Sequence, residues 1–239
     1  MPFMPLLTQR DRRAELMDDP AIDPADHQAA LVGLRRVNRW SRSSAIVWPT
    51  IRSLAKNSSQ RPVRVLDLAC GGGDVTREIA QRAAQAQLPI EIHGCDIHPF
   101  AVEYSRVGET PRDAVPVSFF QLDVLQDELP NDYDVLMCSL FLHHLSDEEA
   151  LQFLRRMMSA TRQLVLVNDL CRTRFGYLLA WAGCRLLTRS PIVHHDGPLS
   201  VRAAFTINEI EKLTREAGMM ETRMTRHWPQ RFLLSWRKD

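Results

Sequence analysis

Two pairs of histidines stand where side chains could move protons. His143 and His144 follow a short apolar run, and His194 and His195 come directly before Asp196. The imidazole side chain titrates near neutral pH, and a neighbouring carboxylate shifts its pKa. Both pairs therefore suit general base catalysis. In the alternative interpretation, one histidine of the first pair only packs or caps a turn, and the second pair is a solvated loop. The spacing of the four histidines matches no recognised metal cluster, so we expect no metal site.

Three aspartates form a second set of candidate residues, because each lies within or directly after an apolar run typical of a strand. They are Asp67, Asp96 and Asp123, and Gly71-Gly72-Gly73 follows the first of them. Carboxylates accept hydrogen bonds from ribose and adenine groups, and glycines let a ligand approach the backbone closely. Taken singly, each aspartate could instead be a polar strand end, a helix cap or a turn residue. Together they predict a nucleotide-binding edge.

The glycine turn does not fit the two commonest nucleotide motifs. Counted from Gly71, Thr76 holds the third glycine position of a dinucleotide fingerprint. A phosphate-binding loop would need a Gly-Lys-Ser/Thr ending, which is absent.

Alternating strand and helix signals predict how these residues are positioned. We expect strands over residues 63–68, 90–95, 115–122, 133–140 and 163–167, and helices over 75–87, where Asp74 would cap the helix, over 98–107 and from 146. Two helices at 25–39 and 43–55 precede this pattern, and a helix over 206–217 and two strands at 219–228 and 232–236 end it. Ser146 with Glu149, and Thr206 with Glu209, have the spacing of capping boxes. The alternation predicts a parallel sheet with helices on both faces.

The order of these motifs resembles one enzyme family. Residues 65–73 read Val-Leu-Asp-Leu-Ala-Cys-Gly-Gly-Gly and resemble motif I of the class I S-adenosylmethionine (SAM)-dependent methyltransferases, with Ala69 in place of the first glycine. Residues 93–97, 121–125 and 134–145 resemble the second-, third- and fourth-strand motifs of that family. The resemblance covers about 63–236. It implies an α/β, Rossmann-like, seven-stranded and mostly parallel sheet whose last strand is antiparallel.

The same resemblance implies the cofactor and its site. The cofactor would be SAM, leaving S-adenosylhomocysteine (SAH) as product, with Asp96 accepting from the ribose hydroxyls and Asp123 from the adenine amino group. The implied cofactor-binding residues are Asp67, Ala69, Gly71, Gly73, Asp96, Ile97, Asp123, Val124, Ser139 and Leu140. Asn38, Arg39 and Arg42 could reach the carboxylate of SAM, or could form a solvated helix face.

We expect residues 1–60 to form an N-terminal helical cap and 61–239 the SAM-binding domain, with 171–205 as a substrate lid. Within that insertion Phe175, Tyr177, Leu178 and Trp181 suit an apolar acceptor or form the core of the lid. An amphipathic helix would occupy its first part, and 189–200 reads as a turn-rich segment.

The predicted function is methyl transfer to an oxygen or carbon atom of a small, largely apolar acceptor, such as a phenolic, quinone-like or polyketide compound. The resemblance is to the branch with ubiquinone/menaquinone-type and polyketide- or phenol-modifying enzymes. His143, His144 and His195 are the candidate catalytic residues. Ser139 and Leu140 stand where enzymes that methylate base amines carry Asn/Asp-Pro-Pro-aromatic, so no nucleic acid is expected. The alternatives are a non-catalytic SAM/SAH-binding protein acting through protein contacts, and a protein methyltransferase.

Charge distribution and cysteine content indicate the partners and the cellular location of the protein. The net charge is +1, but residues 1–61 and 171–239 are basic and 62–170 are acidic. These basic flanks pack against the acidic centre or form a rim that allows peripheral membrane contact. The five cysteines include no Cys-x-x-Cys pair, and residues 175–187 are too short to span a bilayer. A cytoplasmic monomer or homodimer without a signal peptide or transmembrane segment is expected.

Overall fold

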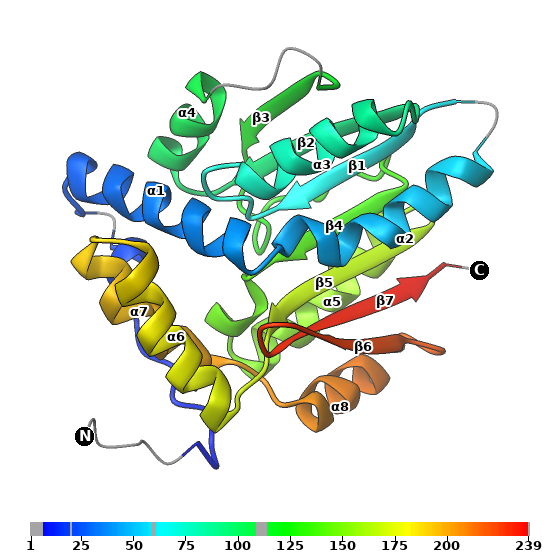
Figure 1. The fold of residues 1–239 in the computed structure, drawn as a ribbon. Coiled ribbons are helices and arrows are strands. Elements are labelled where there is room, and N and C mark those ends of the chain that lie inside the picture. The colour runs from blue at the N-terminus through cyan, green and yellow to red at the C-terminus, as the bar shows by residue number, and fades with distance from the viewer. Residues whose placement is uncertain (1–6, 20, 59–60, 109–113, 239) are drawn as a thin grey trace.

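One seven-stranded sheet organises the molecule (Figure 1). The computed structural model describes residues 7–19, 21–58, 61–108 and 114–238. The strand order is β3-β2-β1-β4-β5-β7-β6, and β7 runs antiparallel to both of its neighbours. This confirms the predicted fold. The strands are β1 (Val63–Leu68), β2 (Ile90–Asp96), β3 (Val117–Gln121), β4 (Val135–Ser139), β5 (Leu164–Leu170), β6 (Arg223–His227) and β7 (Arg231–Arg237).

Helices cover both faces of the sheet, as the alternation predicted. One apolar layer joins the strands to α2 and α3, and a second joins them to α5 and α8. The helices are α1 (Pro24–Trp40), α2 (Ser43–Asn57), α3 (Asp74–Gln85), α4 (Pro99–Val107), α5 (Asp147–Ala160), α6 (Arg174–Leu187), α7 (Pro191–Ala203) and α8 (Ile207–Ala217), with the short 3-10 helices η1 (Leu16–Asp18) and η2 (Leu142–His144).

The helix ends follow the capping signals in the sequence. Ser146 and Thr206 each accept a hydrogen bond from the backbone N–H three residues later, and the glutamates Glu149 and Glu209 bond back to the cap. Gly218 ends α8 with φ 86°, a left-handed conformation that glycine adopts without steric cost. Both capping boxes are confirmed.

Two local predictions were wrong. The segment 189–200 is not turn-rich, because α7 runs through Gly197 and Pro198. Ser190 caps this helix and Pro191 occupies its first position, where no N–H bond is lost. Burial of Val193 and Val201 then outweighs the low helix propensity of the glycine and proline, since most helical stability comes from tertiary packing.

The second error concerns the start of α3. Asp74 does not cap this helix, because Gly73 is its N-cap, with φ 70° and no side chain to offer. Asp74 is the first helical residue. Its carboxylate is therefore free to face the region above the sheet, where the site lies.

The N-terminal helices differ in what they contact. α2 shares one apolar core with the sheet through Val47, Ile51 and Leu54, whereas α1 packs against α6 and α7 (Figure 1). Residues 171–205 contain the α6–α7 pair. The domain boundaries drawn from the sequence stay a prediction. Across the described residues, no helix combines the length and the apolar character that a membrane span requires.

The glycine turn offers a matched test of the fold. Gly71 and Gly73 both have positive φ, but a Cβ on Gly73 would lie 2.6 Å from the Phe119 ring, whereas a Cβ on Gly71 would meet no atom within 4 Å. Replacing either by alanine costs about 1 kcal/mol for the left-handed conformation. Gly73→Ala is expected to cost roughly 1–3 kcal/mol more, because the buried ring must shift. Urea unfolding without cofactor measures both, and equal losses would contradict the role of Phe119.

Candidate active site

A cavity of about 430 Å³ lies at the carboxyl ends of the parallel strands. Open α/β sheets bind ligands at this edge, where backbone and side-chain polar groups of several strands meet. The turn after β1, the ends of β2 and β4, and η2 form one side of the cavity. The segment 7–19, α1, α6 and α7 form the other, so residues far apart in the chain enclose one space.

Asp96 fixes the glycine turn at this edge. Its two carboxylate oxygens accept from Gly71 N at 2.8 Å and from His98 N at 2.9 Å. Burial raises the pKa of Asp96, and these hydrogen bonds oppose that rise. Each carboxylate oxygen retains a second lone pair, so Asp96 can still accept from the hydroxyl of a ligand.

The cavity gathers part of the set of residues predicted to bind the cofactor. Ala69, Gly71, Asp96, Ile97, Ser139 and Leu140 line it. The other four, Asp67, Gly73, Asp123 and Val124, are not among its lining residues. Asp123 accepts from Leu125 N and Gln126 N in the loop after β3, and its predicted contact with adenine stays a prediction.

Three lining residues, Ala69, Leu140 and Gln230, adopt a backbone conformation that is rare for residues other than glycine. Ala69 follows β1 with φ 54°, and Leu140 follows β4 with φ 58°. Such residues cost free energy and persist where the surrounding structure holds them, often at ligand sites. Leu140 is held by its N–H, which donates to Asn168 O at 2.8 Å.

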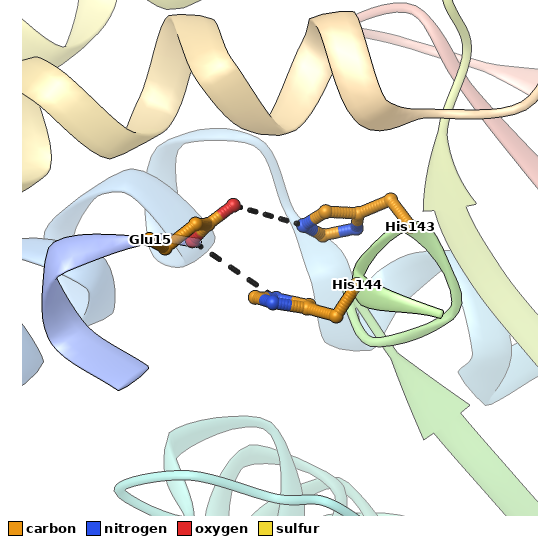
Figure 2. Close-up of side chains that lie close together, drawn as sticks. All are labelled: Glu15, His143 and His144. Carbon is orange, nitrogen blue, oxygen red and sulfur yellow. Dashed lines mark ion pairs between the residues drawn. The ribbon is translucent and has the colours of Figure 1, made fainter. Parts of the chain in front are cut away.

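His143 is the most deeply buried of the candidate catalytic residues. Its Nδ1 lies 2.7 Å from Asp169 Oδ1 at the end of β5, and its Nε2 lies 3.7 Å from Glu15 Oε1 (Figure 2). The His143 backbone N–H also donates to the Asp169 carboxylate, at 3.1 Å. Asp169 therefore fixes the orientation of the imidazole, with Nε2 as the other exchangeable site.

Two carboxylates decide the protonation of His143. Burial alone would lower its pKa, but the charge and hydrogen bond of Asp169, together with Glu15, raise the pKa of His143 to about 10. Burial raises the pKa of Asp169, but the His143 charge together with the hydrogen bonds from His143 and Leu170 outweighs burial, and the net pKa of Asp169 is lowered. The pair is an imidazolium and a carboxylate at neutral pH. In its neutral form His143 is an unusually strong base.

His144 joins the same group from the other side of Glu15. Its Nε2 lies 4.0 Å from Glu15 Oε2, and its Nδ1 lies 3.0 Å from Asp18 Oδ2 (Figure 2). The rings of His143 and His144 lie 4.3 Å apart and 34° from parallel. Each histidine thus faces one oxygen of Glu15 and keeps a second carboxylate on its Nδ1.

The segment 7–19 carries Glu15 into the site. Asp196 on α7 accepts from Leu16 N at 3.0 Å and Met17 N at 3.1 Å, and Ser200 donates to Glu15 at 2.6 Å. Arg10 donates to the carbonyls of Leu145 and Ala203, each at 2.8 Å. These bonds tie the segment to η2 and α7.

Among the described residues, Glu15, His143 and His144 form the group that could hold a metal. Their ligand atoms lie within 4.8 Å of one another. The near-parallel rings direct their Nε2 atoms at separate oxygens of Glu15 rather than at one common point (Figure 2). This geometry suits a shared carboxylate, and the expected absence of a metal stays a prediction.

His195 lies apart from the other two candidates. Its Nδ1 is 2.8 Å from Asp196 Oδ1, as the neighbouring positions allow, but its side chain is 54% exposed. It is not among the residues that line the cavity. The structure therefore brings together His143 and His144 but not His195.

Sequence reasoning missed three groups that the structure places here: Glu15, Asp169 and Arg231. The sequence contained a signal for Asp169, because this residue stands at the end of a predicted strand, as do the candidate site residues Asp67 and Asp96. Glu15 and Arg231 had none, because each reaches the site only through contacts between distant parts of the chain.

The far side of the cavity is apolar. Leu31, Leu34 and Val37 line it from α1, and Leu179 and Leu187 line it from α6. Phe175 and Leu178, expected to contact an acceptor, are instead 52% and 42% exposed. The apolar walls and the buried histidine–carboxylate pair thus share one space with the glycine turn.

Comparisons with known proteins agree with this arrangement. Residues 65–163 match the model of a methyltransferase domain family. Ubiquinone biosynthesis O-methyltransferase of Pseudomonas aeruginosa is 28% identical over 160 residues, which are 65% of this chain and 64% of the relative. The enzyme of the same name from Methylococcus capsulatus is 27% identical over 159 residues. The chain therefore spans a little under two thirds of the length of these relatives.

Solved structures share the fold. The plantazolicin methyltransferase BpumL, solved with SAH and a substrate analogue, matches with a TM-score of 0.68 at 15% identity over 93% of this chain and 94% of that one. Magnesium protoporphyrin IX methyltransferase from Synechocystis PCC 6803, solved with SAH, matches with a TM-score of 0.54 at 18% identity over 92% and 90%.

Asp67 provides a test of the electrostatics beneath the site. Its carboxyl group is buried, accepts from Thr76 Oγ1 at 2.6 Å and has no partner for Oδ1. Burial, with the charges of Asp74 and Asp96, raises its pKa to about 7. Since the folded pKa lies above the unfolded value of about 3.9, stability falls as pH rises from about 4 to about 7.

Asp67→Asn removes the buried carboxylate, and with it the loss of stability that its ionisation causes as the pH rises. The variant should match the wild type near pH 4 and gain on the order of 2–4 kcal/mol at pH 8, measured by urea unfolding. Glu128→Gln, which neutralises an exposed carboxylate, serves as the control. A gain for Asp67→Asn that is equal at both pH values would show that the carboxyl group is not the cause.

Proposed function

We propose that this chain, which belongs to the class I SAM-dependent methyltransferases, transfers a methyl group to an oxygen or carbon atom of a small, largely apolar acceptor such as a phenolic, quinone-like or polyketide compound. One observation carries the proposal. The cavity joins Asp96 and the glycine turn to the buried His143–Asp169 pair and to apolar walls from α1 and α6. The names of the ubiquinone O-methyltransferase relatives support this class of acceptor.

The lining residues fit the cofactor that the family uses. A Cβ at Gly71 would meet no atom within 4 Å, so the backbone leaves room for a ligand at this turn. Asp96 would accept from the ribose hydroxyls, and Ile97 offers an exposed apolar surface beside it. SAM supplies the methyl group, as a sulfonium-bound electrophile. The carboxylates of Asp96 and Asp74 at this end suit its positive charge.

His143, in its neutral form, is the proposed general base for an acceptor that must lose a proton. Because its pKa is about 10, the neutral form is the minor one at neutral pH and the rate of transfer should rise with pH up to that value. Asp169 holds Nδ1, so a proton from the acceptor would arrive at Nε2. A phenol has a pKa near 10, close to the value of about 10 for His143. Proton transfer between groups of matched pKa has little thermodynamic cost, which favours a phenolic hydroxyl over an aliphatic one.

The apolar walls of the cavity would position the acceptor and exclude water. Methyl transfer gains most from holding the two reactants in line and from excluding water. Leucines of α1 and α6 offer an apolar acceptor a matching surface. A non-catalytic SAM/SAH-binding protein would leave the buried histidine–carboxylate group with a structural role only, and a protein methyltransferase would have no need of the apolar walls.

The location, oligomeric state and partner of the protein are also proposals. We place the protein in the cytoplasm as a monomer or homodimer, with the small acceptor as its partner. Its five cysteines are free in the structure, which suits a reducing compartment.

Asp96→Ala should weaken SAM binding by at least 10-fold, because two hydrogen bonds to ribose hydroxyls and the anchor of Gly71 are lost. Isothermal titration calorimetry with SAM and SAH measures this. Glu128→Gln is again the control, and unchanged affinity in Asp96→Ala would refute the assignment of the cofactor site.

His143→Gln should lower kcat by roughly 10²- to 10⁴-fold for a phenolic acceptor, the usual contribution of a general base. Acceptors are found by screening candidate compounds with methyl-labelled SAM, and SAH affinity in the variant should stay unchanged. His144→Gln should have a smaller effect, and His195→Gln the smallest, because that ring lies outside the cavity. Full turnover in His143→Gln would leave methyl transfer without this base.

A further inference from the structure

Arg231, the first residue of β7, is a buried charge that the proposed chemistry does not use. It is 2% exposed and lines the cavity. Its Nη1 donates to Ser43 Oγ at 2.5 Å, while its Nε is buried without a partner. Within the described residues, no carboxylate forms an ion pair with this guanidinium.

Such a side chain is costly to bury unless an anion binds it. Burial lowers the pKa of Arg231 to about 10, although the charges of Asp169 and Asp74 oppose this. A guanidinium presents several N–H donors in a planar fork that matches a carboxylate. Arg231 therefore offers unused donors to a carboxylate ligand inside the cavity.

The start of α2 contacts Arg231 directly, although residues 43–57 are not among those that line the cavity. This helix has 15 residues, and its N-cap, Arg42, has a left-handed conformation and gives no side-chain hydrogen bond. Ser43, which accepts from Arg231, is the first helical residue. The N-terminal end of a helix carries a partial positive charge and free N–H groups, so it also favours an anion.

An opposite charge lines the cavity next to the glycine turn. Asp74 is the first residue of α3, and burial raises its pKa while the Asn38 side chain hydrogen-bonds to it. Asp74, Asn38 and Arg231 all line the cavity. An unpaired carboxylate and an unpaired guanidinium in one cavity match a zwitterion, with an ammonium group for the first and a carboxylate for the second.

We propose that Arg231, held in place by its hydrogen bond to Ser43 at the start of α2, binds the carboxylate of the amino-acid end of SAM. This rests on the proposed function, since it assumes that SAM occupies the cavity. It differs from the expectation that Asn38, Arg39 and Arg42 reach this carboxylate, because Arg39 and Arg42 are exposed and are not among the lining residues, while Asn38 lines the cavity beside Asp74. The cofactor would then be held by β7, the one antiparallel strand, as well as by the parallel strands.

The test compares two ligands by calorimetry. SAH carries the amino-acid end, whereas 5′-methylthioadenosine has the same nucleoside and sulfur without it. Arg231→Met should weaken the binding of SAH by about 10- to 100-fold, which is the usual contribution of a hydrogen bond to a charged group. It should change the affinity for 5′-methylthioadenosine less than twofold. Arg231→Lys, which keeps the charge but not the fork, should be intermediate.

Controls separate this effect from damage to the fold. Arg52→Met changes an exposed arginine of α2 and should alter neither affinity. The melting temperature of unliganded Arg231→Met should not fall, because an unpaired buried charge is removed. If that variant does not fold, Ser43→Ala and Arg231→Lys carry the same comparison, and each should weaken SAH but not 5′-methylthioadenosine.

Three results would overturn the proposal. The first is unchanged SAH affinity in Arg231→Met, and the second is an equal loss for both ligands. The third is unchanged SAH affinity with a raised KM for an acceptor that bears a carboxylate, which would assign the anion to the acceptor. Failure of the proposed function is distinguishable. If the cavity is not a SAM site, the wild type binds neither SAH nor 5′-methylthioadenosine; if the protein binds SAM without catalysis, the wild type binds SAH but methylates no acceptor in the screen with labelled SAM.

Discussion

The buried ion pair between His143 and Asp169, with Glu15 on its other side, holds three distant parts of the chain together. Asp169 ends β5, His143 lies in η2 and Glu15 comes from the segment 7–19. Two buried carboxylates require a positive charge between them, because an uncompensated buried charge is strongly destabilising. The imidazolium supplies that charge. The position of the N-terminal segment, and through Ser200 its attachment to α7, follows from this requirement.

The two ends of the cavity are formed by different kinds of structural element. The cofactor end stands on the sheet, where strand ends place carboxylates and strained residues such as Ala69 at fixed positions. The proposed acceptor end consists of helices α1, α6 and α7, which contact one another. Residues 65–163, which match the methyltransferase family, stop before α6. The family likeness therefore describes the cofactor end, and the acceptor walls belong to the part of the chain outside it.

Charge is distributed along the cavity in a way that fits a reaction between a cation and a weakly acidic acceptor. Asp96 and Asp74 lie at the glycine turn, Arg231 lies at the start of β7, and the His143 imidazolium lies between carboxylates. In a cavity with apolar walls these charges are screened less than they would be in water, so their placement governs which groups of a ligand can bind where.

The sequence by itself determined the sheet, its helices and the glycine turn, because periodic burial, capping residues and strand-end aspartates are local signals read within a few residues. It also identified Asp96 and His143 as candidates. It misread 189–200, since Gly197 and Pro198 disfavour a helix locally while burial of α7 against α6 favours one. Only the tertiary structure decided that Glu15 and Arg231 meet in one cavity, that Asp169 pairs with His143 at its wall, and that His195 stays outside it. Contacts across more than a hundred residues, such as Arg231 with Ser43, depend on how whole elements pack, and no local pattern records that.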